Sequence, residues 1–300
     1  MMKFLCALGL CLLAGCSKQQ EAAEVPSPAP RSTPAPKLLV LATIAPMYCF
    51  TKNITGDLAD VELIIPPGTP AQGFQPSPGE TQKILHAGLI VENGFGFEPW
   101  MDQLEANGLK PGLRVIASRG AGPGIPGLPG DPNSPPGDIP SDSSGPPDPH
   151  VWLDPIMAIK ELQNIRDALM AHDPAHATDY FTNESRYETT LRDLDDEVGR
   201  TTVDIKNRRL VCITNAFSYF LSRYEFPVAA TVATPAALTA ANTGNADAVL
   251  LPSGPGQPIL NTSLLPVVKA DPMDTGSASA DFYLQVTRAN AEALREGLPQ

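Results

Sequence analysis

Basic residues are scarce in this sequence. It contains 21 lysines and arginines against 33 aspartates and glutamates, so the formal net charge at pH 7 is -12. The basic residues also form no cluster along the chain. Because a nucleic-acid interface needs concentrated positive charge, we expect no nucleic-acid partner.

Recognisable catalytic motifs are lacking as well. The chain has no Gly-x-Ser-x-Gly segment and no phosphate-binding glycine loop, and these are signatures of acyl and phosphoryl transfer. We therefore expect that the protein is not an enzyme. A hydrolase that activates water at an open His/Asp metal site is kept as an alternative, although no general base with a recognisable motif accompanies such a pair.

The apolar run near the N-terminus is too short to cross a bilayer. Residues 4–13 follow Lys3, have the length of a signal-peptide core and end in Leu13-Ala14-Gly15-Cys16. Small residues followed directly by cysteine resemble the lipobox of bacterial lipoproteins. We expect a signal peptide over residues 1–16 and an exported protein, anchored in a membrane by lipid on Cys16 and facing the periplasm or the cell surface. An ordinary cleaved signal with a coincidental cysteine is the alternative.

Few cysteines remain once such a signal peptide is removed. Of the five in the sequence, only Cys49 and Cys212 would then keep a side-chain thiol. The sequence is compatible with two buried free cysteines and with a disulfide between them.

Proline, in contrast, is abundant. The chain has 33 prolines, about twice the usual share of roughly 5%. They collect in two segments, residues 17–37 and 119–149. We expect the first to be an extended tether and the second to be a long surface loop of unknown role. Gly-x-y triplets in the loop break at Asn133, so a collagen-like helix is excluded.

The rest of the chain alternates between short apolar runs and helical segments, which predicts an α/β fold with parallel sheets. Four strands are expected in an N-terminal lobe over residues 38–178, and four more in a C-terminal lobe over residues 207–300. Each lobe would be of (βα)4 type, with a ligand cleft between them. The expected strands lie at residues 38–44, 61–65, 89–91, 113–116, 210–213, 229–232, 248–251 and 267–270.

A long amphipathic helix is expected to link the lobes. Residues 179–206 contain no proline, and their apolar residues recur at helical spacing on one face. The positions that carry this pattern are Tyr180, Tyr187, Leu191, Leu194 and Val198.

Four motifs follow one another along the chain: IPPGTPAQGFQPSPG at residues 65–79, LIVENGFGFEPWM at 89–101, DPHVWLDPI at 148–156 and TNAFSYFLSRYE at 214–225. In this order they resemble the metal-specific family of ABC-transporter solute-binding proteins, which deliver zinc or manganese. The last helix adds Tyr283 and Asn290 at the family's Tyr-x6-Asn spacing. The resemblance covers residues 38–300 and implies two lobes with a metal cleft between them.

The resemblance implies four metal ligands at Gln72, His150, Thr214 and Asp271. The family uses three imidazoles and one carboxylate, which suit Zn²⁺ or Mn²⁺. Only His150 and Asp271 keep a good donor, so we expect weakened binding. Asp274 competes with Asp271 for the carboxylate role. His150 as a structural support for its own motif, and Asp271 as a turn residue, are the alternatives.

The resemblance also implies a function. We expect a lipoprotein that captures a divalent cation, Zn²⁺ or Mn²⁺, and delivers it to the membrane subunits of an ABC permease. The alternative is a degenerate member that no longer binds metal tightly and acts as a surface interaction or adhesion protein.

Overall fold

The computed structural model describes residues 36–71, 73–121, 148–255, 257–258, 260 and 265–299. The chain from Lys37 to Gln300 forms one compact unit. The expected signal peptide, nearly all of the tether and residues 122–147 of the proline-rich loop lie outside the described residues. Within the described ranges, no helix is long and apolar enough to cross a membrane.

The N-terminal lobe is built on a four-stranded parallel sheet in the order β2-β1-β3-β4. The residues of β3 are all buried, as expected for a strand covered on both faces. The strands are β1 (Leu38–Ala42), β2 (Ala59–Leu63), β3 (Leu89–Glu92) and β4 (Leu113–Ile116). The helices are α1 (Ala45–Thr55), α2 (Pro78–His86), α3 (Pro99–Ala106) and α4 (Pro155–His172), with a short 3-10 turn η1 (Val151–Leu153) before α4.

The C-terminal lobe repeats this topology, with a parallel sheet in the order β6-β5-β7-β8. The strands are β5 (Leu210–Ile213), β6 (Val228–Val232), β7 (Ala248–Pro252) and β8 (Val267–Ala270). The helices are α6 (Ser218–Arg223), α7 (Ala240–Thr243) and α8 (Phe282–Gly297). The expectation of two α/β lobes with parallel sheets is confirmed.

Local sequence explains where several helices begin. Ser77 and Glu80 form a capping box at the start of α2, and Pro78 stands at its first turn. Asp154 caps α4 by accepting hydrogen bonds from the backbone N–H groups of Ile156 and Met157. These caps fix the backbone conformation where the connecting segments enter the two helices.

The long helix α5 (Ala177–Thr202) is shorter at its C-terminus than the expected 179–206. Beyond Thr202 the chain turns, and the backbone N–H of Ile205 donates to the Thr202 carbonyl at 3.2 Å. The turn buries Ile205, which is 6% exposed, on the way into β5. Val198 is the last apolar residue of the helical pattern. The pattern therefore did not indicate the residue at which the helix ends.

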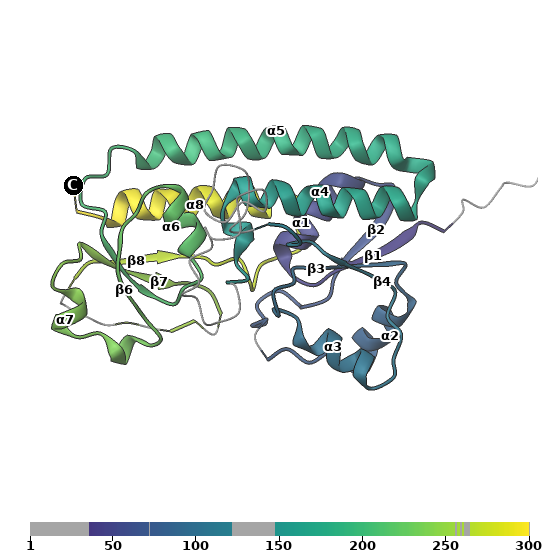
Figure 1. The fold of residues 1–300 in the computed structure, drawn as a ribbon, viewed down its shortest axis with the longest axis horizontal. Coiled ribbons are helices and arrows are strands. Elements are labelled where there is room, and N and C mark those ends of the chain that lie inside the picture. The colour runs from purple at the N-terminus through teal and green to yellow at the C-terminus, as the bar shows by residue number, and fades with distance from the viewer. Residues whose placement is uncertain are drawn as a thin grey trace, which may run out of the picture. The chain divides into compact units, whose positions relative to one another are not determined.

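Helix α5 packs against α1 and α4 of the N-terminal lobe and against α8 of the C-terminal lobe. Figure 1 shows it running along α4 and α8, on the side of these helices away from the two sheets. A continuous apolar core crosses between the lobes beneath it, and the Phe50 and Tyr283 rings lie 5.0 Å apart within that core.

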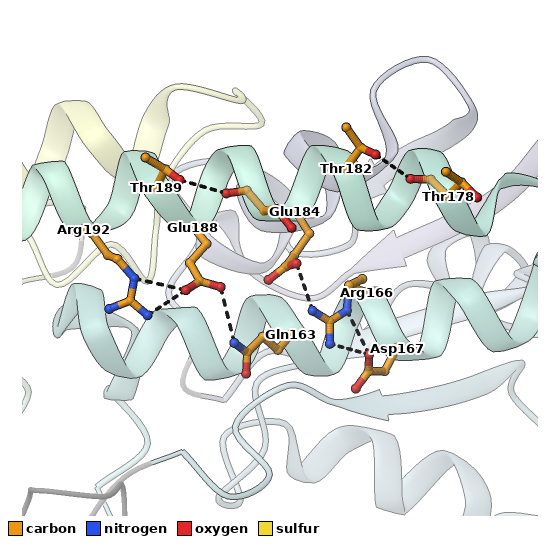
Figure 2. A network of polar contacts seen from close by, with 10 residues as sticks. Gln163, Arg166, Asp167, Thr178, Thr182, Glu184, Glu188, Thr189 and Arg192 are labelled. Atoms are coloured by element: carbon orange, nitrogen blue, oxygen red, sulfur yellow. Dashed lines mark hydrogen bonds and ion pairs between the residues drawn. The ribbon is translucent and has the colours of Figure 1, made fainter.

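Polar contacts add to the packing of α4 on α5. Arg166 of α4 donates to Glu184 of α5 at 2.9 Å, and Gln163 donates to Glu188 at 3.4 Å. Figure 2 shows these side chains meeting between the two helices, with Arg192 pairing to Glu188 along α5. Glu184 is 1% exposed, so its ion pair is buried.

Cys49 and Cys212 are buried and form no disulfide. Cys49 donates to the carbonyl oxygen of Ala280 at 2.8 Å. Burial raises the pKa of the Cys49 thiol to about 11, and that of Cys212 to about 12. Both are therefore inert packing residues, which settles the question that the sequence left open.

Candidate functional site

Three of the four expected metal ligands fall on described residues, and all three lie next to strand ends or a turn. Thr214 directly follows β5 and Asp271 directly follows β8. His150 precedes the 3-10 turn η1. Gln72 lies outside the described residues. In parallel α/β sheets, ligands bind beyond the carboxyl ends of the strands, which is where Thr214 and Asp271 stand.

His150 is held by Asp148. The His150 ring Nδ1 lies 2.6 Å from Asp148 Oδ1, which also accepts from the His150 backbone N–H at 3.1 Å. Burial alone would raise the pKa of Asp148, but hydrogen bonds from His150 and Ser218 bring it below its ordinary value. An ionised Asp148 accepts the proton of Nδ1, which leaves the Nε2 lone pair of His150 for a cation.

Asp148 also joins the two lobes. Its Oδ2 accepts from the Ser218 hydroxyl at 2.5 Å, and its carbonyl accepts from Tyr219 at 3.3 Å. Ser218 and Tyr219 belong to α6 of the C-terminal lobe. The carboxylate that orients His150 is thus itself positioned by the opposite lobe.

On its other side, the chain before His150 is fixed by the turn that follows β3. Asn93 donates through Nδ2 to the carbonyl of Pro149 at 3.0 Å. Glu98 holds this turn by accepting from the backbone N–H groups of Asn93 and Gly94. Burial raises the pKa of Glu98 to about 7, despite these hydrogen bonds and one from Thr43.

Asp271 is fixed by helix α8. Its backbone N–H donates to Asn290 Oδ1 at 2.7 Å, and its carbonyl accepts from Asn290 Nδ2 at 2.8 Å. Its Oδ1 also accepts from the backbone N–H of Met273. Asn290 therefore positions the strand end, which accounts for its place in the Tyr-x6-Asn pattern.

Thr214 has an unusual backbone conformation, with φ at 113°. A β-branched residue in this region is strained, because its Cβ substituents crowd the backbone. Its hydroxyl accepts from the Ala216 N–H at 3.3 Å, which is a turn contact.

The loop that follows β8 is tied to the N-terminal lobe at two points. Trp152 donates from its indole Nε1 to the carbonyl of Pro272 at 3.0 Å. The backbone N–H of Gly68 donates to the carbonyl of Thr275 at 2.8 Å. Gly68 belongs to the Pro-Pro-Gly motif, so this motif and the loop after β8 meet across the lobes.

His150 also has the structural contacts that its alternative interpretation requires. Its ring lies 5.0 Å from the Trp152 ring and 5.9 Å from that of Phe97. Packing and metal ligation are compatible, because the Trp152 and Phe97 rings hold the His150 ring in a fixed direction. Within the described residues, however, no three His, Cys, Asp or Glu side chains lie close enough together to form a ready-made metal site.

The sequence did not identify the residues that position the site. Asp148 and Ser218 lie inside motifs that were recognised, but their contact spans the lobes and has no sequence signature. Asp154 lies in the same motif as His150, and it caps α4. Burial raises the pKa of Asp154 to about 6, against the lowering effect of its backbone hydrogen bonds and of Arg223.

The family of this chain follows from comparison with known proteins. The family described as zinc-uptake complex component A, periplasmic (ZnuA), matches residues 40–248. The chain belongs to this family. The resemblance drawn from the motifs is thereby confirmed. Because this is a family of uptake components, the expectation that the protein is not an enzyme is also confirmed.

Individual relatives are named for the binding or transport of metals. The chain is 32% identical over 197 residues to the iron-binding protein YfeA of Yersinia pestis, covering 65% of this chain and 59% of YfeA. It is 29% identical over 228 residues to the metal ABC transporter substrate-binding lipoprotein SsaB of Streptococcus sanguinis, covering 74% and 68%. The aligned part of the chain thus spans about three fifths to two thirds of these relatives.

A solved structure agrees over nearly the whole described fold. The Zn(II)-bound ZnuA-like domain of Streptococcus pneumoniae AdcA superposes with a TM-score of 0.67 at 25% identity. The match covers 88% of this chain and 100% of that domain. The two-lobed architecture is therefore that of the family.

Proposed function

We propose that this protein is the solute-binding component of a metal-ion ABC importer. It would capture a divalent cation, Zn²⁺ or Mn²⁺, in the cleft between its lobes and deliver the cation to the membrane subunits of the permease. The observation that carries the proposal is the pairing of Asp148 with His150 beside the loop of Asp271, in a chain of the zinc-uptake family.

The proposed donors differ in strength. His150 offers an oriented Nε2 and Asp271 offers a carboxylate, whereas Gln72 and Thr214 offer only a neutral amide oxygen and a hydroxyl. Two imidazoles of a three-histidine site are missing, so the affinity for zinc would be well below that of a complete site. The cation would be transported cargo, and a loose site would favour its release to a permease.

Direct measurement of bound metal tests this function. We expect the purified full chain to bind one Zn²⁺ or Mn²⁺ saturably in a calorimetric titration, with elemental analysis reporting any metal retained through purification. The His150→Ala variant should lose most of this binding. The matched control is His86→Ala, which removes an exposed imidazole at the end of α2. Tight zinc binding that survives His150→Ala would contradict the proposed site.

We also propose that lipid on Cys16 anchors the protein after export. The support is the lipobox-like order Leu13-Ala14-Gly15-Cys16. Cys16→Ser should move the protein from the membrane to the soluble fraction. Several acyl chains on one residue hold a protein on a bilayer, and the variant would carry none at this position. Fractionation and fatty-acid labelling measure this. Equal distribution and labelling of the two chains would rule the anchor out.

A second function, surface interaction or adhesion with a vestigial cleft, is favoured by one observation. No ready-made group of three strong donors occurs in the described residues. The titration separates the two functions, since a vestigial cleft would bind neither metal.

A further inference from the structure

Helix α6 carries the contacts that hold Asp148, but the helix itself is short. It spans six residues, and no side chain caps its start. Helices shorter than about 12 residues are marginal by themselves, so tertiary contacts must hold this one in place. Phe220 and Leu221 are each 1% exposed and join the apolar core. Apolar packing is not directional, so it does not by itself fix where the polar side chains of α6 point.

The C-terminal end of α6 is tied to the long helix α5. The Arg223 guanidinium forms two hydrogen bonds with the Asp195 carboxylate, from Nε to Oδ1 at 2.9 Å and from Nη2 to Oδ2. The Tyr224 hydroxyl donates to the same Oδ1 at 2.9 Å. A bidentate pair of this kind fixes direction as well as distance.

Asp195 is a firm support for this contact. Its neighbours Leu191, Leu194 and Val198 are buried beneath α5, which packs on helices of both lobes. The Asp195 side chain is 11% exposed, so its ion pair is nearly buried. Such pairs add little net stability, because removing two charges from water costs about as much as their attraction returns. Orientation of α6 explains the pair better than stability does.

The two ends of α6 therefore connect α5 to the environment of His150. At its start, Ser218 donates to Asp148 Oδ2 at 2.5 Å, and Tyr219 donates to the Asp148 carbonyl. Asp148 Oδ1 in turn lies 2.6 Å from His150 Nδ1. Ser218 and Arg223 are about 7.5 Å apart along the helix axis. A shift of α6 at the Arg223 end would thus displace the Ser218 hydroxyl, and a hydrogen bond tolerates little displacement.

We propose that Arg223 is a positioning residue for His150, and that it acts through α6 by fixing this helix against Asp195 of α5. This inference rests on the proposed function, in which His150 binds the cation. Arg223 touches neither the cation nor its ligands. Its effect reaches His150 through Ser218 and Asp148.

The first test is a double-mutant cycle on metal affinity. Zn²⁺ and Mn²⁺ titrations compare the unmutated full chain with Arg223→Gln, Ser218→Ala and the double variant. We expect each single change to weaken binding about tenfold, the lower end of the loss typical of an outer-shell partner. The double variant should also lose about tenfold, because both changes interrupt the same path. Independent effects would instead multiply to about 100-fold.

Arg288→Gln is the matched control. Arg288 of α8 pairs with Glu197 of α5 at 2.9 Å, so this variant removes another ion pair between α5 and the C-terminal lobe without touching α6. It should leave the metal affinity unchanged. Should Arg223→Gln fail to fold, Arg223→Gln combined with Asp195→Asn leaves no unpaired charge and gives the same comparison.

A second measurement needs no metal. The backbone N–H of His150 donates to Asp148 Oδ1 at 3.1 Å, and that of Met273 donates to Asp271 Oδ1 at 2.7 Å. In Arg223→Gln, the amide hydrogen of His150 should exchange faster with solvent and that of Met273 should not, because only the first depends on α6. Equally faster exchange of both amides would indicate a general loss of stability.

Selective exchange at His150 together with a non-additive loss of affinity would support the inference. It would be overturned by an unchanged affinity in the folded Arg223 variant, by affinity losses that multiply in the double variant, or by equal acceleration of the two amides. If the unmutated chain binds neither metal, the proposed function is wrong, and the amide exchange alone then decides whether Arg223 positions His150.

Discussion

Replacing Gln72 and Thr214 together by histidine is expected to raise the zinc affinity roughly 100-fold or more, which is about 2.8 kcal/mol. The reason is that the two imidazoles would complete, with His150 and Asp271, the tetrahedral donor set that zinc prefers. Competition titration of zinc against a chelator of known affinity measures the gain in the double variant.

Each single variant should gain less than half of this free energy, because an incomplete shell leaves a coordination position to water. Thr214→His should also be tolerated by the fold. Histidine adopts positive φ more readily than a β-branched residue, and Thr214 has φ at 113°. The double variant Gln72→Ala with Thr214→Ala is the matched control and should show no gain. A histidine pair that gains nothing, or a gain that survives His150→Ala, would mean that the four side chains do not converge.

The second large effect concerns stability. Arg166→Met is expected to lower the free energy of unfolding by about 3–5 kcal/mol, because it leaves Glu184 as an unpaired charge in the α4–α5 interface. Glu184 is 1% exposed, and its Oε1 already lacks a partner within the described residues. Urea denaturation followed by circular dichroism measures the loss.

Arg192→Met on the same helix pair is the control. Arg192 pairs with Glu188 along α5, and its side chain is 56% exposed. Exposed ion pairs contribute about 0–1 kcal/mol, so this variant should stay close to the unmutated chain. An equal loss of unfolding free energy in the two variants would show that the buried ion pair contributes no more stability than the exposed one. Replacing Glu184 by Gln in the Arg166→Met background should restore part of the loss.

The strands were predictable where they are buried on both faces. β3, β5 and β7 are short apolar runs with every residue buried, and each was expected within one residue of its position. β2 was expected at residues 61–65 and lies at Ala59–Leu63. Ile64 and Ile65 are buried beyond the strand, so their apolar character marked the core and not the strand.

The candidate site was predictable only in part. The motifs predicted which residues stand at the strand ends, because a strand, the turn after it and the next helix are each indicated by residues close together in the sequence. Thr214 and Asp271 directly follow strands, and His150 directly precedes a 3-10 turn. Their role as metal ligands stays a prediction from the resemblance. Asp148 was not assigned a role, since its partner Ser218 lies 70 residues away in the other lobe.

The sequence by itself determined the family and the two parallel α/β lobes, and it predicts that two imidazoles of the family's ligand set are missing. These conclusions follow from the identity of residues and from their spacing within short segments of the chain. Only the tertiary structure decided that Asp148 orients His150 and that Ser218 of the other lobe positions Asp148. Such facts depend on which groups meet across the lobes and how far water is excluded, and no local pattern records either.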